Sequence, residues 1–362
     1  MKRIITLTAA LVLLTSFSFA QNRVPKEVMK KVFQEVKTPY KYGLVMVPEN
    51  NNLRNDCPTI FRKDGKWYMS YFEFDGRGYQ THLAESDDLL HWNKLGQIFP
   101  FGPKGAWDEN QRGGYVSLVD IKWGGGYKVS KYDNKYWMSY IGGDTPGYEQ
   151  GDLGIGIATT DDVTALKTWT PLPNNPIFTP NDKDVSWWDN MVQYKNLVIE
   201  DKKKVSGYRF LMYYNARGDS MKTKEKRGAE RIGLAVSNDM VNWKRYGKEP
   251  LLNHHTGITG DAQIAKIGNV YVMFYFGAFW KPAAFERFAC SYDLVHWTDW
   301  EGENLISPSE DFDIQFAHKP YVIKWKGIVY HFYNSVDKND RRGIAVATSK
   351  DLRKSTMRYP EK

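Results

Sequence analysis

The chain has 362 residues, a formal net charge of +8, an aromatic fraction of 15% and only two cysteines. So few cysteines exclude a disulfide-stapled scaffold, and we expect Cys57 and Cys290 to be buried free thiols. Much of the positive charge lies in one short segment at 222–227, which indicates a solvated loop and not an organised basic face, so no nucleic-acid partner is expected.

Residues 1–20 are predicted to be a signal peptide. A basic start precedes a short apolar run at 4–14, and Ala20 supplies a small residue at the spacing that a signal peptidase recognises. The run is too short to span a bilayer comfortably, and no later segment has the character of a membrane helix. We therefore expect cleavage near Ala20, export to the periplasm or the medium, no membrane partner, and one domain over 21–362.

Helical content is expected to be low and limited to residues 25–36. One phrase dominates the rest of the chain: a short alternating strand, Ser or Thr, a spacer, Asp, an apolar residue and usually Trp. It recurs at 82–92, 157–169, 233–243, 288–297 and 344–352. A hairpin-like pair of strands precedes the phrase, as at 58–62 and 67–71, which are joined by a turn containing Gly65.

Five such units predict an all-β fold, a five-bladed β-propeller of four-stranded antiparallel blades. Each sheet is too small to bury both faces alone, so neighbouring blades stack around a central axis. The fifth unit ends soon after its third strand, and we expect segment 42–47 to supply the missing outer strand. The Asp of each phrase is expected to cap the turn before the outer strand. These residues are Asp88, Asp162, Asp239, Asp293 and Asp351.

Unusual polar residues gather just before the first strand of each unit, where a propeller opens at one mouth of its axis. The candidates for catalysis are Asp56, Asp189, Asp261, His318 and, in the second unit, which is harder to align, Glu109. We take the three aspartates and the histidine as equivalent positions. Each alone could be a surface-loop residue, but convergence on one axis would gather them in one pocket. Close carboxylates raise one another's pKa, so that one holds a proton while another is ionised, as cleavage of a glycosidic bond requires.

The sequence Asn55-Asp56-Cys57-Pro58 opens the first inner strand, and a Gly turn and an aromatic-rich second strand follow it. This pattern resembles the five-bladed propeller glycoside hydrolases of families 43, 32, 117 and 130. The resemblance in blade pattern covers essentially the whole mature chain. It implies that Asp56 is the general base of an inverting enzyme or the nucleophile of a retaining one.

The same resemblance leaves the general acid open. Families 43 and 32 place a Glu, typically before Pro, at a blade opening, and no unit opens with such a phrase here. Asp189 stands where a third-blade acid is expected, and Asp261 is a second candidate. His318 is another, because family 117 is thought to use a His acid and an imidazole with a pKa near ~6.5 donates protons around neutrality. A hydrogen bond to a sugar hydroxyl is its alternative role, and Glu109 is a weaker candidate for the acid.

Aromatic and polar side chains near these openings are candidates for substrate binding. The tryptophans that could stack on sugar rings, or simply pack in the core, are Trp107, Trp188 and Trp280. The side chains that could bind sugar hydroxyls or a sugar carboxylate are Asn55, Arg112 and Lys319. No dedicated metal motif is present in the sequence, so we expect no cofactor; a structural Ca²⁺ in the central channel is not indicated and stays open, as does the oligomeric state.

These observations predict an exported glycoside hydrolase that cleaves an oligo- or polysaccharide with acidic side chains at the propeller axis. Two alternatives are kept. A glycoside phosphorylase would use phosphate in place of water and would need several cationic groups at the same mouth. A non-catalytic carbohydrate-binding propeller would keep aromatic platforms without an acid–base pair.

Overall fold

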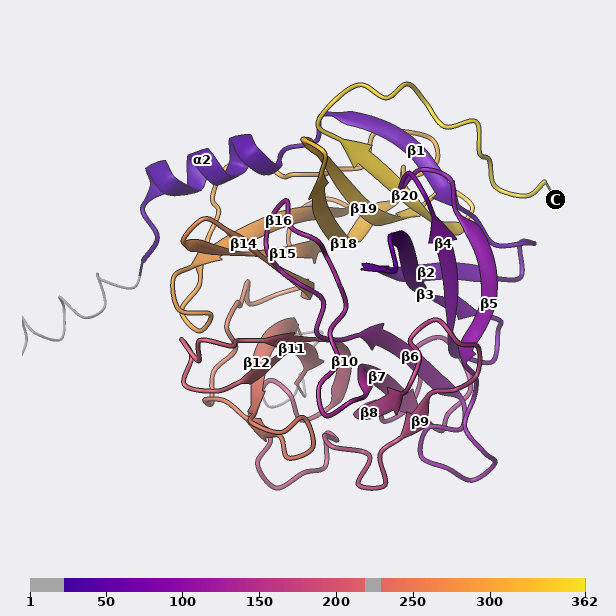
Figure 1. The fold of residues 1–362 in the computed structure, drawn as a ribbon, viewed down its shortest axis with the longest axis vertical. Coiled ribbons are helices and arrows are strands. Elements are labelled where there is room, and N and C mark those ends of the chain that lie inside the picture. The colour runs from indigo at the N-terminus through magenta and orange to yellow at the C-terminus, as the bar shows by residue number, and fades with distance from the viewer. Residues whose placement is uncertain (1–22, 219–228, 362) are drawn as a thin grey trace, which may run out of the picture.

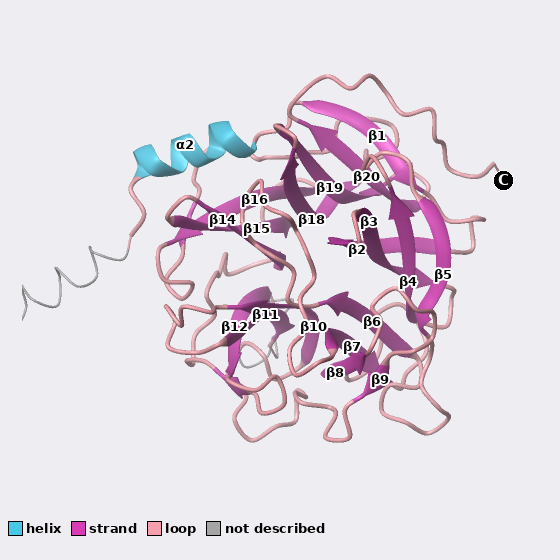
Figure 2. Ribbon diagram, viewed as in Figure 1, coloured by secondary structure: helices cyan, strands magenta, loops and turns pink. Residues whose placement is uncertain are grey.

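The computed structural model describes residues 23–218 and 229–361, which form an all-β fold with one helix among them (Figures 1 and 2). The helix is α2 (Lys26–Val36), which confirms the prediction of a short helix in this region. Its apolar face, which includes Met29 and Val32, is buried in a cluster with Phe274 and Trp300. Within the described ranges, no helix has the length and apolar character needed to cross a bilayer. The predicted signal peptide lies outside the described residues.

Two antiparallel sets of strands form separate four-stranded sheets. The first set consists of β2 (Arg54–Lys63), β3 (Lys66–Phe74), β4 (Tyr79–Ser86) and β5 (Asn93–Phe99). The second set consists of β6 (Gln111–Val116), β7 (Tyr136–Gly143), β8 (Gly154–Thr160) and β9 (Thr170–Pro171). In both sets each strand pairs antiparallel with the next one along the chain.

Three further sets are joined into one twelve-stranded sheet. The third set consists of β10 (Val192–Glu200), β11 (Phe210–Arg217), β12 (Glu230–Ser237) and β13 (Lys244–Arg245). The fourth set consists of β14 (Ile258–Ile267), β15 (Val270–Ala278), β16 (Ala284–Ser291) and β17 (Thr298–Asp299). The fifth set consists of β18 (Phe316–Trp325), β19 (Ile328–Val336), β20 (Arg342–Thr348) and β1 (Tyr40–Met46). Single parallel pairings, Glu230 with Ile258 and Ala284 with Phe316, join these sets.

The fifth set is completed by a strand from the other end of the chain. β1 pairs antiparallel with β20, for example through Leu44 and Ala345, which confirms the role predicted for segment 42–47. Figure 1 shows the indigo β1 beside the yellow β20, and all five sets lie around one centre. Apolar cores fill the space between neighbouring sets, as where Leu83 of β4 and Met138 of β7 share a cluster.

The turn after the third strand of each set is capped by an aspartate. This confirms the prediction for the first four sets; in the fifth set Asp351 follows β20, and the outer strand β1 comes from the other end of the chain. Oδ1 of Asp88 accepts hydrogen bonds from the backbone N–H groups of Leu90 (2.9 Å) and His91 (2.8 Å). Bonds of the same kind are made by Asp162, Asp239, Asp293 and Asp351. The two cysteines are buried free thiols, which also agrees with the prediction.

Candidate active site

Four of the first strands carry a bulge at the same end. The pairing register shifts after Asp56 in β2, Gln193 in β10, Gly260 in β14 and His318 in β18. In three of these strands the next residue has a positive φ: 50° at Cys57, 58° at Asp261 and 63° at Lys319. A bulge bends its strand and re-aims a side chain. Here the three bulged residues all line one cavity.

This register corrects the predicted alignment of the units. Asp56 is equivalent to His318, whereas Asp261 is equivalent to Cys57 and Lys319. Because successive side chains of a strand point to opposite faces, a difference of one residue changes what a side chain meets. Asp261, like Cys57 and Lys319, lines the cavity. At the other register position His318 also lines it, whereas Asp56 is fully buried and is not among the lining residues.

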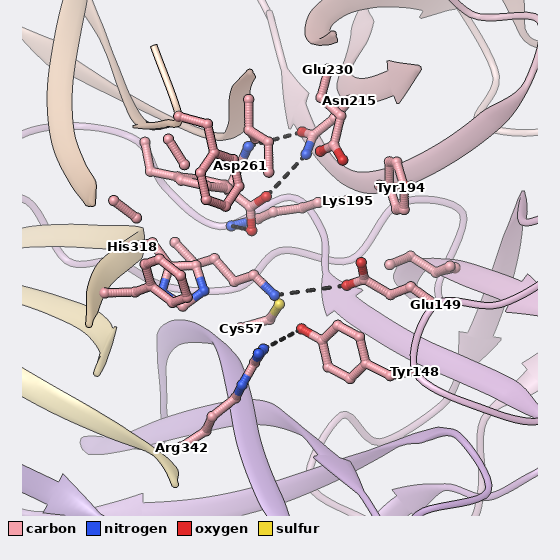
Figure 3. Close-up of a pocket in the computed structure, with 18 of the residues that line it drawn as sticks. Cys57, Tyr148, Glu149, Tyr194, Lys195, Asn215, Glu230, Asp261, His318 and Arg342 are labelled. Atoms are coloured by element: carbon pink, nitrogen blue, oxygen red, sulfur yellow. Dashed lines mark hydrogen bonds and ion pairs between the residues drawn. The ribbon is translucent and has the colours of Figure 1, made fainter. Parts of the chain in front are cut away.

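The bulged strand ends surround a cavity of about 250 Å³ (Figure 3). Every one of the five sets contributes to its lining. The charged lining residues are Glu149, Glu230, Asp261, Lys195, Lys319 and Arg342. The structure thus brings together three of the residues singled out in the sequence, Asp261, His318 and Lys319.

Two glutamates of the cavity have raised pKa values, but to different extents. Glu230 is the first residue of β12, and its burial, reinforced by the charge of Glu149, raises its pKa to about 8. Burial also raises the pKa of Glu149, but the ammonium of Lys319, with Nζ 3.9 Å from Oε1, opposes this. The Glu149 side chain also keeps 26% of its surface exposed. At neutral pH Glu230 therefore holds a proton, and Glu149 is the more acidic member of the pair.

Asp261 is held in place by neighbours on two other strands. Its Oδ1 accepts a hydrogen bond from Asn215 Nδ2 (3.0 Å), and its backbone N–H donates to Asn215 Oδ1 (2.9 Å). The Nζ of Lys195 lies 3.6 Å from Oδ2. These contacts fix the carboxylate at the cavity wall. Among the described residues, no three His, Cys, Asp or Glu side chains are grouped to hold a metal ion.

Asp56 lies behind the cavity as the centre of a buried polar cluster. Its Oδ2 accepts hydrogen bonds from Lys319 Nζ (2.9 Å), Tyr79 OH (3.0 Å) and Tyr148 OH (3.2 Å). Burial alone would raise the pKa of Asp56, but the charges of Lys319 and Arg342 outweigh it and hold this pKa well below its usual range. Asp56 is therefore an ionised carboxylate whose oxygens are already engaged by protein groups.

His318 lines the cavity as a neutral imidazole. Burial, reinforced by the charge of Lys319, lowers its pKa to about 3. Its Nδ1 lies 3.3 Å from the carbonyl oxygen of Asn334 and donates to it, which leaves Nε2 as an acceptor. The ring also contacts Phe276 and Phe316, at 5.4 and 5.9 Å between centroids. An imidazole in this state accepts a hydrogen bond and is not charged near neutrality.

No protein-family model and no curated protein matches this sequence, but solved structures do. The structure of BT0996 in complex with RGII is 47% identical over 94% of this chain and 99% of that chain, with a TM-score of 0.90. A second structure, named as a glycoside hydrolase, is 46% identical over the same shares, with a TM-score of 0.89. This protein belongs to the glycoside hydrolases.

More distant glycoside hydrolases share the fold of this enzyme. A thermostable family-43 enzyme is 16% identical over 87% of this chain and 97% of that chain, with a TM-score of 0.60. The family-117 enzyme Zg3597 from Zobellia galactanivorans is 14% identical over 90% and 96%, with a TM-score of 0.62. The resemblance seen in the sequence is thereby confirmed, and the protein is a glycosidase.

In this glycoside hydrolase, two of the predicted acids lie outside the cavity. Asp189 precedes β10 and is fully buried, with Oδ2 accepting hydrogen bonds from Arg245 Nε (2.8 Å) and Tyr214 OH (3.0 Å). Glu109 lies between β5 and β6, where its carboxylate accepts the N–H of Gly105 (2.7 Å). Neither residue is among those that line the cavity.

Five of the six predicted substrate-binding side chains also lie elsewhere in the glycoside hydrolase. The tryptophans pack on ring neighbours: Trp107 on Tyr140, Trp188 on Tyr214 and Trp280 on His254. Arg112 forms an ion pair with Asp108, and Asn55 donates a hydrogen bond to Glu73. Lys319 is the one that lines the cavity.

The sequence analysis missed Glu149, Glu230 and Arg342 because it examined only the start of each first strand. In an antiparallel set, the second strand ends and the third begins at that same edge. Glu230 accordingly pairs with Arg217 at the end of β11, and Arg342 pairs with Val336 at the end of β19. A charged residue at the first position of a third strand was therefore an available signal.

Proposed function

We propose that this enzyme hydrolyses a glycosidic bond with Glu230 as the general acid and Glu149 as the second carboxylate. The observations that carry the proposal are the raised pKa of Glu230, at about 8, and the position of Glu149 in the same cavity with Oε1 3.9 Å from Lys319 Nζ. A carboxyl group with a pKa of about 8 still holds its proton at neutral pH, whereas its partner beside Lys319 ionises first. Glycoside hydrolysis requires this division between two carboxyl groups.

In the proposed reaction, Glu230 donates its proton to the glycosidic oxygen while the bond from that oxygen to the anomeric carbon breaks. The Glu149 carboxylate either attacks the anomeric carbon, which leads to retention, or accepts a proton from the attacking water, which gives inversion. Asp261, held by Asn215, adds a further negative charge near the developing oxocarbenium ion. The anomeric configuration of the first product distinguishes the two routes.

We propose a positioning role for Asp56, in place of the base or nucleophile role that the family resemblance implies. Its carboxylate is fully buried and hydrogen-bonded to Lys319, which in turn approaches Glu149. Asp56 would therefore act on the reaction through Lys319, by keeping this ammonium beside the second carboxylate. Asp261 and His318 line the cavity and are proposed to contact the substrate.

A carbohydrate of the RGII kind is the proposed substrate. The proposal is supported by the 47% identical relative, whose structure is a complex with RGII. Hydrolysis is favoured over phosphorolysis because the cations of the cavity already have acidic partners. Lys319 pairs with Asp56, Arg342 with Asp340, and Lys195 lies near Asp261. Added phosphate should therefore leave turnover unchanged.

The proposed architecture is a five-bladed β-propeller in which residues 21–362 form one catalytic domain. Support comes from five antiparallel sets around one centre and from β1, which completes the last set. We also propose that residues 1–20 are a signal peptide and that the enzyme is exported. That proposal rests on the basic and apolar pattern of those residues.

Product analysis with an RGII oligosaccharide tests the assignment. Glu230→Gln should lose turnover of this substrate but retain turnover of a nitrophenyl glycoside, whose leaving group needs little protonation. Glu149→Gln should lose turnover of both substrates. Wild-type turnover of the oligosaccharide in both folded variants would show that the assignment is wrong.

A further inference from the structure

A second cavity lies at the far end of the strands that begin at the active site. Along β14, Asp261 lines the active-site cavity and Lys266 lines the second one, and along β10 the corresponding residues are Lys195 and Glu200. The step from Asp261 to Lys266 corresponds to roughly 17 Å of extended strand. We call this second cavity the rear cavity. Its volume of about 710 Å³ is in the range of ligand-binding pockets.

One wall of the rear cavity is formed by residues 117–131, part of the connection between β6 and β7, which we call the crossing segment. It runs across the centre of the fold (Figure 1) and is bonded to two other sets. The N–H of Leu118 donates to the carbonyl oxygen of Val198 (3.2 Å), and the N–H of Trp123 donates to that of Lys266 (3.0 Å). These backbone bonds fix the crossing segment between β10 and β14.

Trp123 of the crossing segment presents a fixed aromatic surface to the rear cavity. Its Nε1 donates a hydrogen bond to Glu35 Oε1 on α2 (2.8 Å). Its ring stacks on buried Phe274, at 6.1 Å between centroids and 29° between planes, and remains half-exposed. Because its polar tip and its packing are satisfied by the protein, the remaining ring surface is a flat apolar platform. The C–H face of a sugar ring stacks on such a surface.

The acidic side chains of the rear cavity are engaged by protein groups. Oδ1 of Asp120 accepts a backbone N–H of the crossing segment (3.0 Å), and Oδ2 of Asp201 accepts a backbone N–H of its own turn (3.0 Å). Glu200 forms an ion pair with Arg209 (2.8 Å). These carboxylates therefore neutralise few of the lysines that line the rear cavity, which are Lys122, Lys128, Lys202, Lys203 and Lys266.

Three of these lysines are exposed and form no ion pair with any described residue: Lys122, Lys128 and Lys203. The other two have partners. Lys202 Nζ lies 3.7 Å from Glu200, and Lys266 Nζ donates a hydrogen bond to Tyr271 OH (3.0 Å). The rear cavity thus combines free ammonium groups with an aromatic platform.

We infer that the rear cavity is a second, non-catalytic binding site for an acidic carbohydrate. The ring of a uronic acid would stack on Trp123, and its carboxylate would pair with the three free lysines. A phosphate group would use the lysines but would gain nothing from the indole. The inference uses the membership in the glycoside hydrolases, and it does not depend on the roles proposed for Glu230 and Glu149.

Two matched ligands test whether the charge of the sugar is recognised. Trigalacturonate and its trimethyl ester have the same sugar rings, but only the first carries carboxylates. Isothermal titration of the wild-type enzyme at low salt should show about tenfold tighter binding of the acid, because each exposed ion pair changes affinity by about two- to fivefold. The difference should shrink at about 1 M salt, where charges are screened within about 3 Å.

Two triple variants test whether this binding takes place in the rear cavity. The first changes Lys122, Lys128 and Lys203 to Gln and should lose about tenfold in affinity for trigalacturonate. The matched control changes three exposed lysines outside both cavities to Gln: Lys31, Lys167 and Lys350. It loses the same net charge and should bind as the wild type does. Both variants should keep wild-type kcat/KM on a nitrophenyl glycoside, because the rear cavity lies away from the active site.

Trp123→Ala and Trp123→Phe test the aromatic platform. Removal of the ring should weaken the binding of the acid and of the ester by about tenfold, whereas Phe should retain most of the affinity. Wild-type affinity for trigalacturonate in folded Trp123→Ala would mean that charge alone is recognised, and the assignment of a carbohydrate site would be wrong.

Equal binding of acid and ester, or equal affinities in the two triple variants, would also overturn the inference. The lysine variants change only exposed side chains, so this test stands even if Trp123→Ala fails to fold. Failure of the proposed function has a different signature, namely wild-type turnover in folded Glu230→Gln.

Discussion

The turn after the third strand of each set, here called the outer turn, repeats one residue type in one role. The start of each first strand, here called the inner end, repeats a backbone shape but not the residue that occupies it. At the outer turns one residue type recurs with one role, because an aspartate caps the turn in every set. At the inner ends the bulge recurs but its residue changes, from Cys57 to Asp261 to Lys319. The repeated backbone thus provides a frame, and the chemistry lies where the repeats differ in sequence.

The largest effect should come from Glu230→Gln, which removes an acid at an inner end. An amide of the same shape cannot donate the proton, so we expect kcat/KM on an RGII oligosaccharide to fall by about 10²- to 10⁴-fold. The measurement is initial-rate kinetics at neutral pH, with circular dichroism as a check on folding.

Glu109→Gln is the matched control for this prediction. Glu109 lies outside the cavity, so the same change should leave kcat/KM at the wild-type value. If Glu109→Gln and Glu230→Gln lost kcat/KM equally, a place in the cavity lining would not distinguish a catalytic carboxylate from a non-catalytic one.

Asp56→Asn should give the next largest effect, on stability. The change leaves the buried Lys319 ammonium without its counter-charge, which costs about 3–5 kcal/mol of the free energy of unfolding. The pKa of Asp56 in the folded protein lies below its unfolded value of about 4. Its stabilisation is therefore present above that pH and is lost on acidification, so the difference between the variant and the wild type should shrink below about pH 4. Urea unfolding over a range of pH measures this.

Asp189→Asn sharpens the same comparison. Asp189 is equally buried, but its partner Arg245 also pairs with Asp182 and Asp184, so the loss of stability should be smaller. Turnover per folded molecule should stay at the wild-type level in this variant and fall in Asp56→Asn. If the two variants lost stability and turnover to the same extent, the positioning role proposed for Asp56 would be wrong.

The pH dependence of kcat/KM in the wild-type enzyme should follow the titration of Glu230, the proposed general acid. Because the raised pKa of Glu230 is about 8, kcat/KM should fall roughly tenfold per unit as the pH rises beyond that value. On the acidic side, kcat/KM should begin to fall at a pH above the ordinary glutamate pKa, because burial raises the pKa of Glu149. In Glu230→Gln the alkaline limb should disappear. If it persisted there, another group would be the acid.

Features set by local pattern were predictable from the sequence, and features set by register were not. The caps such as Asp88 and the helix at 26–36 follow from short-range spacing. The strand that completes the last set follows from the repeat, because the fifth unit is one strand short. The bulges that send Asp261 into the cavity and Asp56 behind it depend on which residues pair across strands. Glu149 lies in the connection between β7 and β8, whose conformation has no periodic signature.

The smallest effect should come from an outer turn. Asp88→Ala removes a carboxylate that accepts two backbone N–H groups, and we expect a loss of about 1 kcal/mol in the free energy of unfolding. The neighbouring Asp87→Ala also removes an exposed carboxylate but no cap, so it should have almost no effect on stability. Both variants should keep wild-type kcat/KM, because the outer turns hold the frame without touching the cavity. A loss of turnover in fully folded Asp88→Ala would mean that a change at the outer turn reaches the inner strand ends, and the division of roles between them would not hold.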